Sequence, residues 1–262
     1  AYPLQIESAL EEIFTVNHTK LAPSALLAED LLYLLDGREE FDDGWSGFKH
    51  YVGDYDEADK IDQLKAYFQN AITDADVITM GIGNAAFGAF MLDRVTSAFG
   101  VFGAELNKKL TLEDALLLVE DEELKQNLLE FYNELKADLS ALIPAELSDK
   151  FDIVTACDIV IYTAASYIVN YKLVLEKILE MNPDVEIVLV GLLNTTYGMN
   201  ITDADGNVLF AFGDTMDTLF DMLNAYMAGL PAVLQAAGEY EDATIFYAEQ
   251  PAPKFICQEF DD

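Results

Sequence analysis

The segment from residue 76 to residue 87, Asp-Val-Ile-Thr-Met-Gly-Ile-Gly-Asn-Ala-Ala-Phe, constrains the fold more than any other part of the chain. Its apolar run from Val77 to Ile82 ends at Gly83, and a segment with helical periodicity follows directly. A strand that ends in glycine and leads into a helix is typical of α/β proteins, which bind ligands at the carboxyl ends of parallel strands. The segment therefore predicts an α/β fold with a site beside Gly83 and Asn84.

Three other short segments predict strands, at residues 15–21, 185–193 and 243–248. Largely apolar strands that alternate with long helices indicate a parallel sheet buried on both faces. We therefore expect a three-layer α/β/α sandwich with a mostly parallel, flavodoxin-like sheet. Residues 1–262 would form a single domain, with a helical insertion or cap over residues 100–152. The expected helices cover residues 2–14, 25–35, 57–73, 85–99, 111–142, 154–181 and 214–236.

Local signals mark several of the expected helix ends. Ser24 is the expected N-cap of the helix over 25–35, and Asp36-Gly37 is its expected end. Thr111 suits the start of the helical region over 111–142, which we expect to be broken once. Asn182-Pro-Asp ends the helix over 154–181, since proline does not continue a helix.

Acidic residues far outnumber basic residues in this chain. The 262 residues include 48 Asp and Glu against 14 Lys and Arg, which gives a formal net charge of -34 at pH 7. This charge repels nucleic-acid phosphates and anionic lipid head groups, so we expect no nucleic-acid partner and no anionic membrane partner. Cations and cationic partners are favoured instead. With 52% hydrophobic residues, the chain can still build a large core.

Three further features concern the location of the protein. The longest apolar stretches, such as residues 159–169, are too short and too interrupted to span a bilayer, which needs about 20 apolar residues. The only cysteines are Cys157 and Cys257, which allow either one disulfide or two unpaired thiols. No signal peptide is visible at Ala1, as in a processed secreted protein or a trimmed chain. Together with the acidic composition, this predicts an extracellular or cell-surface protein.

Three segments, taken in order, resemble the conserved blocks of one family. Residues 20–35 contain Leu-Ala-Pro-Ser-Ala and then Ala-Glu-Asp-Leu-Leu, residues 76–87 contain the strand that ends at Gly83, and residues 170–192 contain Asn-Tyr-Lys, Asn-Pro-Asp and Val-Gly-Leu. Their order and spacing resemble the SGNH or GDSL-type hydrolases, especially the bacterial GDSL-like lipase/acylhydrolase group. The resemblance spans most of the chain. It implies an SGNH-hydrolase-like sheet and, as ancestral chemistry, hydrolysis of an ester or acetyl group.

The resemblance also implies where a catalytic cleft would lie. In the family, the strand is followed by Gly-x-Asn-Asp, whose Asn side chain donates a hydrogen bond to the oxyanion. Gly83 and Asn84 match the first two places, but Ala85 and Ala86 occupy the last two, and a methyl group cannot donate a hydrogen bond. A register shifted by one would make Asn84 the donor and put Ile82 in the place of the glycine.

The catalytic groups of the family have no counterpart in this chain. Neither its Gly-Asp-Ser block nor its Asp-x-x-His block is present, and the only histidines are His18 and His50. Ala25 occupies the place of the glycine whose amide serves the oxyanion hole, beside Ser24, the best remaining candidate nucleophile. Because acyl transfer needs a nucleophile and a base together, enzymatic activity is uncertain and no catalytic residue is assigned.

Two interpretations follow from these departures. The chain is a truncated or degenerate SGNH/GDSL-like hydrolase, impaired or inactive as a serine esterase. Alternatively, it is a non-catalytic extracellular structural or interaction module that associates with itself, with a protein partner, or with a small ester or glycan ligand. Neither interpretation requires a metal or another cofactor. The vestigial cleft positions are Ser24, Ala25, Gly83, Asn84, Ala85 and Ala86. We expect Ala85 and Ala86 at the rim of the sheet, where polar side chains could reach water or backbone partners.

Other polar patterns favour structural roles. Asp203-Ala-Asp-Gly-Asn, with Asp214 further on, resembles a calcium loop, but the glycine and the last ligand do not fit that pattern and a β-turn is favoured. Neither histidine has a second ligand at metal-site spacing. Residues 39–45 include the only tryptophan, Trp45, which either lines a sugar- or cation-binding loop or is buried. The glycines of residues 81–88 do not match the dinucleotide-binding motif.

Overall fold

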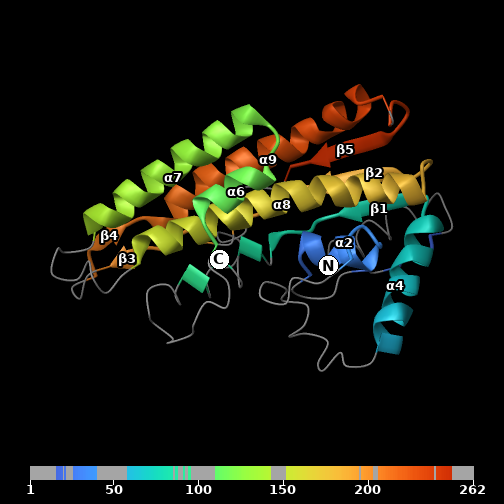
Figure 1. The fold of residues 1–262 in the computed structure, drawn as a ribbon, viewed down its shortest axis with the longest axis horizontal. Coiled ribbons are helices and arrows are strands. Elements are labelled where there is room, and N and C mark those ends of the chain that lie inside the picture. Colours follow the sequence, from blue (N-terminus) through green and yellow to red (C-terminus); the bar gives the residue numbers. More distant parts are fainter. Residues whose placement is uncertain are drawn as a thin grey trace, which may run out of the picture.

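A computed structural model provides the structure of the chain. It describes residues 16–19, 21, 26–39, 58–84, 86–87, 91, 94–95, 110–142, 152–194, 196–202, 206–238 and 240–249. The protein is a mixed α/β structure in which a small parallel sheet lies beside a group of long helices (Figure 1). Several expected features fall outside the described residues: the helix over 2–14, the loop with Trp45, the sites at Ser24, Ala25 and Ala85, and Cys257.

Within the described residues, three parallel strands form the sheet, in the order β1-β2-β5. They are β1 (Val77–Met80), β2 (Glu186–Val190) and β5 (Thr244–Ala248). Ile78 of β1 pairs with Ile187 of β2, which in turn pairs with Ile245 of β5. Three of the four expected strands are therefore confirmed, together with their parallel orientation.

The fourth expected strand, over residues 15–21, is not formed by the described part of that segment. Residues 16–19 and Leu21 have no regular secondary structure. Asn17, His18 and Thr19 are exposed, and only Val16 and Leu21 are partly buried. This short run therefore offers too little apolar surface to be held against a sheet.

The sheet buries one of its faces more completely than the other. Side chains alternate between the two faces of a strand, and Ile187, Leu189 and Ile245 share the buried face. Val77 and Phe246 lie on the opposite face and are 54% and 55% exposed. The expectation that the strands are buried on both faces is therefore wrong for the outer strands β1 and β5, and a three-layer sandwich is not established.

Helix α8 (Ile153–Met181) lies at the centre of the helical group and contacts α2, α4, α6, α7 and α9. With 29 residues it is long and apolar enough to cross a membrane by length and composition, contrary to the sequence-based expectation. Within this structure, 67% of its most apolar window is buried inside the protein. A helix that is apolar on nearly all sides is also typical of the core of a large protein, and α8 has that place here.

Hydrogen bonds connect the carboxyl end of helix α2 (Ala28–Leu34) to helix α4 (Ala58–Thr73). Helix α2 ends where expected, because Asp36 adopts a left-handed backbone with φ of 58°. Its carboxylate accepts hydrogen bonds from Lys65 Nζ at 2.6 Å and Gln69 Nε2 at 2.8 Å, both on α4. The hydrogen bond from Lys65 lowers the pKa of Asp36.

The start of α2 differs from the expectation that Ser24 is its N-cap. The N-cap is Leu27, and its backbone N–H donates to Asp30 Oδ2 at 3.0 Å. An acidic side chain in the first turn thus satisfies an amide that has no partner within the helix. The helix begins at Ala28, three residues later than the sequence suggests.

The region over 111–142 forms two helices, α6 (Leu112–Leu118) and α7 (Glu122–Leu142), so the expected single break is confirmed. Each helix has its own cap. Thr111 Oγ1 accepts from the Asp114 amide at 3.1 Å, and Asp121 Oδ1 accepts from the Leu124 amide at 2.9 Å. Both helices pack against α8, and α7 also packs against α9 (Phe212–Ala236). The described part of the predicted insertion thus covers helices rather than the sheet.

A two-stranded antiparallel hairpin, which the sequence did not predict, precedes α9. It consists of β3 (Ile201–Thr202) and β4 (Val208–Phe210), and β4 packs against α7. Gly206 lies between the strands with φ of 84°, a backbone conformation that favours glycine. Residues 203–205, with two of the suggested calcium ligands, lie outside the described residues.

One buried carboxylate in this helical group is incompletely paired. Asp158 on α8 is 6% exposed, and its Oδ1 atom has no hydrogen-bond partner among the described residues. Burial raises the pKa of Asp158, and hydrogen bonds from the Tyr132 side chain and the Leu112 backbone partly offset this effect. A raised pKa in the folded state means that ionised Asp158 destabilises the fold.

We predict that Asp158→Asn stabilises the protein at neutral pH by about 1–2 kcal/mol, because the amide keeps a hydrogen-bond acceptor and removes a buried charge. The carboxyl group contributes most stability while protonated, below its unfolded pKa of about 3.9, and that contribution is lost as the pH rises through the higher folded pKa. The gain from the substitution should therefore be present at pH 7 and nearly absent below about pH 4. Urea unfolding across this range measures it.

Asp138→Asn is the matched control, because Asp138 is exposed on α7 and its substitution changes the net charge equally. A gain of the same size in both variants would mean that the effect comes from total charge and not from burial.

Candidate functional site

The carboxyl end of β1 is closely packed at Gly83, which is buried and has φ of 122°. A β-carbon at this position would collide with the ring of Tyr167 and would lie 2.8 Å from Leu192 Cδ2. Only glycine suits both this backbone conformation and this space. The strand was expected to end at Gly83, but β1 already ends at Met80. Gly83 lies three residues further on, where close contact with α8 and the segment after β2 requires a glycine.

Asn84 follows directly and is half-buried. Its Oδ1 atom accepts a hydrogen bond from the Leu193 amide at 3.1 Å, so the side chain joins the ends of β1 and β2. Asn224 of α9 binds the same segment: its Oδ1 atom accepts from the Leu192 amide at 2.6 Å, and its Nδ2 atom donates to the Leu192 carbonyl at 3.0 Å. The segment after β2 is thus held by amide side chains from two directions.

A third asparagine fixes the continuation of this segment. Asn194 is buried, and its Nδ2 atom donates to the Gly213 carbonyl at 2.9 Å and to Asp217 Oδ1 at 2.6 Å. Its Oδ1 atom accepts from the amide and the hydroxyl of Thr196, at 2.8 and 2.7 Å. Both ends of this side chain are therefore used within the protein, and the arrangement fixes the backbone.

Aromatic side chains fill the space behind the strand end. The Tyr167 hydroxyl donates to the Ile82 carbonyl at 3.1 Å and lies 3.1 Å from Met227 Sδ. Phe87 packs edge-on against Tyr167 and Phe220, with ring centroids 5.6 and 5.3 Å apart. Burial raises the pKa of Tyr167 well above its usual value, so its hydroxyl is protonated and is not a general base at neutral pH.

The structure brings together three of the six vestigial cleft positions: Gly83, Asn84 and Ala86. Ala86 is 8% exposed, and its amide donates to the Gly83 carbonyl at 2.9 Å. The expectation of an exposed rim at Ala86 is therefore wrong, because the helical turn after the strand points this residue into the core. The positions of Ser24, Ala25 and Ala85 lie outside the described residues.

This strand end has little acid–base chemistry to offer. Its described residues, 81–84, 86–87 and 191–194, include no serine, histidine, cysteine, aspartate or glutamate. No group of three or more His, Cys, Asp or Glu in the described part of the chain could hold a metal ion. His18 is exposed, and Asp214 lies in the first turn of α9. The thiol of Cys157 is free and buried in α8, and burial raises its pKa to about 12.

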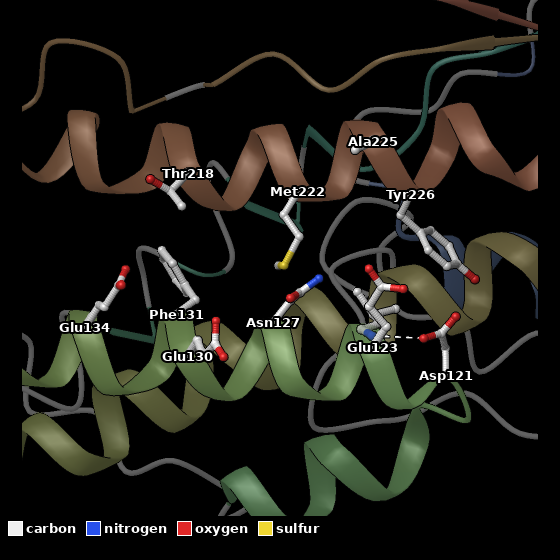
Figure 2. Close-up of a pocket in the computed structure, with 11 residues that line it drawn as sticks. Asp121, Glu123, Asn127, Glu130, Phe131, Glu134, Thr218, Met222, Ala225 and Tyr226 are labelled. Atoms are coloured by element: carbon white, nitrogen blue, oxygen red, sulfur yellow. Dashed lines mark hydrogen bonds between the residues drawn. The ribbon is translucent and has the colours of Figure 1, made fainter.

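A second candidate site is a groove between α7 and α9 (Figure 2). Its volume is about 510 Å³, which is within the range of ligand pockets. Carboxylates line the α7 side, and Met222 and Tyr226 line the α9 side. The sequence analysis missed this groove. Acids at helical spacing over 123–134, with no Lys or Arg over 212–236, are the signals that could have indicated it.

Comparison with known proteins gives no assignment for either site: no family model, curated protein or solved structure matches this chain.

We predict that Gly83→Ala destabilises the fold by roughly 2–5 kcal/mol, because it combines backbone strain with overpacking against Tyr167 and Leu192. Gly238→Ala is the matched control, since Gly238 has φ of 80° but open space around its Cα. The control should lose only the strain contribution of about 1–2 kcal/mol. Chemical denaturation of both variants measures the difference, and equal losses would show that the strand end is not closely packed.

Proposed function

We propose that the chain is a non-catalytic binding module built on an α/β scaffold of the SGNH-hydrolase type. The observation that carries this proposal is the hydrogen bond that the side chain of Asn84 forms. Asn84 is the remaining polar side chain at the place where the family would stabilise an oxyanion, and its carbonyl oxygen holds the Leu193 amide. Here Asn84 serves to join two strands.

The neighbouring positions support the same conclusion. Ala86 is buried and cannot donate a hydrogen bond from its side chain. The Tyr167 hydroxyl lies beside the segment that follows β1, and it is bound to the Ile82 carbonyl. Acyl transfer requires a nucleophile, a base and an oxyanion donor held together, and the described strand end offers no such set.

The parallel order β1-β2-β5 and the strand, helix and turn signals support an SGNH-like scaffold. In this proposal the three strands are one half of the sheet of a three-layer α/β/α sandwich. The exposed side chains of Val77 and Phe246 mark the face that a second helical layer would cover. Ester or acetyl hydrolysis is then the ancestral chemistry, and this chain is a degenerate relative.

The binding role is proposed to be extracellular or at the cell surface, as the acidic composition favours. A net charge of -34 directs the choice of partner toward cationic proteins or ligands and away from nucleic acids. Small esters and glycans, which resemble the substrates of the ancestral chemistry, are the ligands that we propose for the strand end.

Two measurements on the wild-type protein and on Asn84→Ala test the proposal. We predict no labelling by a serine-directed fluorophosphonate and no turnover of p-nitrophenyl acetate above the rate of the denatured protein. Asn84→Ala should reduce the free energy of unfolding by about 1–3 kcal/mol, because the Leu193 amide loses its partner.

A catalytic protein would behave in the opposite way. It would be labelled, and Asn84→Ala would lower its turnover by about 10² to 10³ while changing stability little, as expected for loss of an oxyanion donor. Ser24→Ala is the control in that case, because Ser24 is the serine nearest in sequence to the implied oxyanion hole. Labelling that disappears in Ser24→Ala would overturn the non-catalytic proposal.

A further inference from the structure

The groove between α7 and α9 has an apolar floor and an acidic wall. Leu124 and Phe131 are buried in α7, and Met222 of α9 is half-buried. In Figure 2, Met222 and Phe131 lie in the space between the two helices. The full lining consists of Asp121, Glu123, Leu124, Asn127, Glu130, Phe131, Glu134, Thr218, Met222, Ala225 and Tyr226.

The charge of the groove has one sign. Glu123, Glu130 and Glu134 belong to α7 and Asp121 caps its start, and none of the four forms an ion pair with a lysine or arginine in the described part of the chain. The facing helix α9 contains no lysine or arginine. Burial together with nearby negative charges, including Asp121, raises the pKa of Tyr226 to about 12. Within the described residues, this wall is therefore left without a lysine or arginine ion-pair partner.

The shape of the groove is elongated. The lining residues on this side run from Asp121, which caps α7, to Glu134, which corresponds to about 20 Å along a helix. They follow a helical stripe at 123, 127, 130 and 134, and the stripe on α9 runs through 218, 222, 225 and 226. Two helices that present such stripes to a shared gap offer the packing surface that a third helix requires.

We propose that this groove binds a cationic amphipathic helix of a partner protein. Its apolar residues, spaced at i, i+3 or i+4, and i+7, would pack on Phe131 and Met222, and its lysines or arginines would face the carboxylates of α7. Charge complementarity selects this occupant over a second copy of the chain, because two copies with a net charge of -34 each repel one another. The proposal does not depend on whether the end of β1 is catalytic.

A synthetic peptide tests the proposal with the whole protein. The probe is a fluorescein-labelled helical peptide of leucine and lysine with leucines at i, i+3, i+4 and i+7. A peptide of the same composition with scrambled order is its control. Fluorescence anisotropy should show saturable one-to-one binding of the patterned peptide, at least about tenfold tighter than binding of the scrambled one. Equal affinities would overturn the proposal, because they would show attraction to the overall charge alone.

Substitutions locate the binding. Ala225→Lys puts a cation and added bulk at an exposed position in the groove, and Ala228→Lys is its control on the exposed surface of α9. Glu123→Gln/Glu130→Gln/Glu134→Gln removes three groove charges. Asp74→Asn/Asp184→Asn/Glu241→Gln removes three exposed charges elsewhere. Both groove variants should weaken binding by about tenfold or more, and both controls should stay within about twofold.

Three results would contradict the proposal. The groove variants and their controls could weaken binding equally. A polyamine could displace the peptide as well as an unlabelled copy does, which would indicate a small organic cation as the ligand. Sedimentation could show a dimer of the protein that Ala225→Lys dissociates, which would make a second copy the occupant. Thermal unfolding of each variant confirms that a loss of binding is not a loss of folding.

Discussion

Burial of α8 is the requirement on which the rest of the structure depends. Its seventeen buried positions face in nearly every direction, so a single neighbouring layer could not remove its apolar side chains from water. Instead, α8 packs against five helices, α2, α4, α6, α7 and α9. The same helix carries Tyr167 and Tyr171, whose hydroxyls reach the carbonyls of Ile82 and Met80 at 3.1 and 3.5 Å. Helix α8 thereby joins the helical group to the sheet.

The packing around α8 also accounts for the form of the two candidate sites. Just after β1, the ring of Tyr167 reaches so close to the backbone that Gly83 cannot carry a side chain. Helices α7 and α9 both pack against α8, and the groove lies between them.

Those features that depend on local chemistry could be predicted from the sequence. The cap at Thr111, the end of α2 at Asp36 and the glycine required at Gly83, just after β1, each follow from residue types within a few positions. The periodicity of residues 154–181 likewise indicated the long helix. Features that depend on distant partners could not be predicted: the burial of Ala86, the unequal faces of the sheet and the bond from Asn84 to Leu193. The groove belongs to this second group, because its two walls come from separate helices.

The central place of β2 in the sheet has a consequence for the chain as a whole. One of its neighbours, β1, comes from far upstream, and Asn84 and Leu193, which join the two, are 109 residues apart. The other neighbour, β5, is reached only after α9. An amino-terminal fragment that ends within α8 therefore contains β1 but not β2. A carboxyl-terminal fragment that begins within α8 contains β2 but not β1. The described sheet therefore needs strands from both sides of α8.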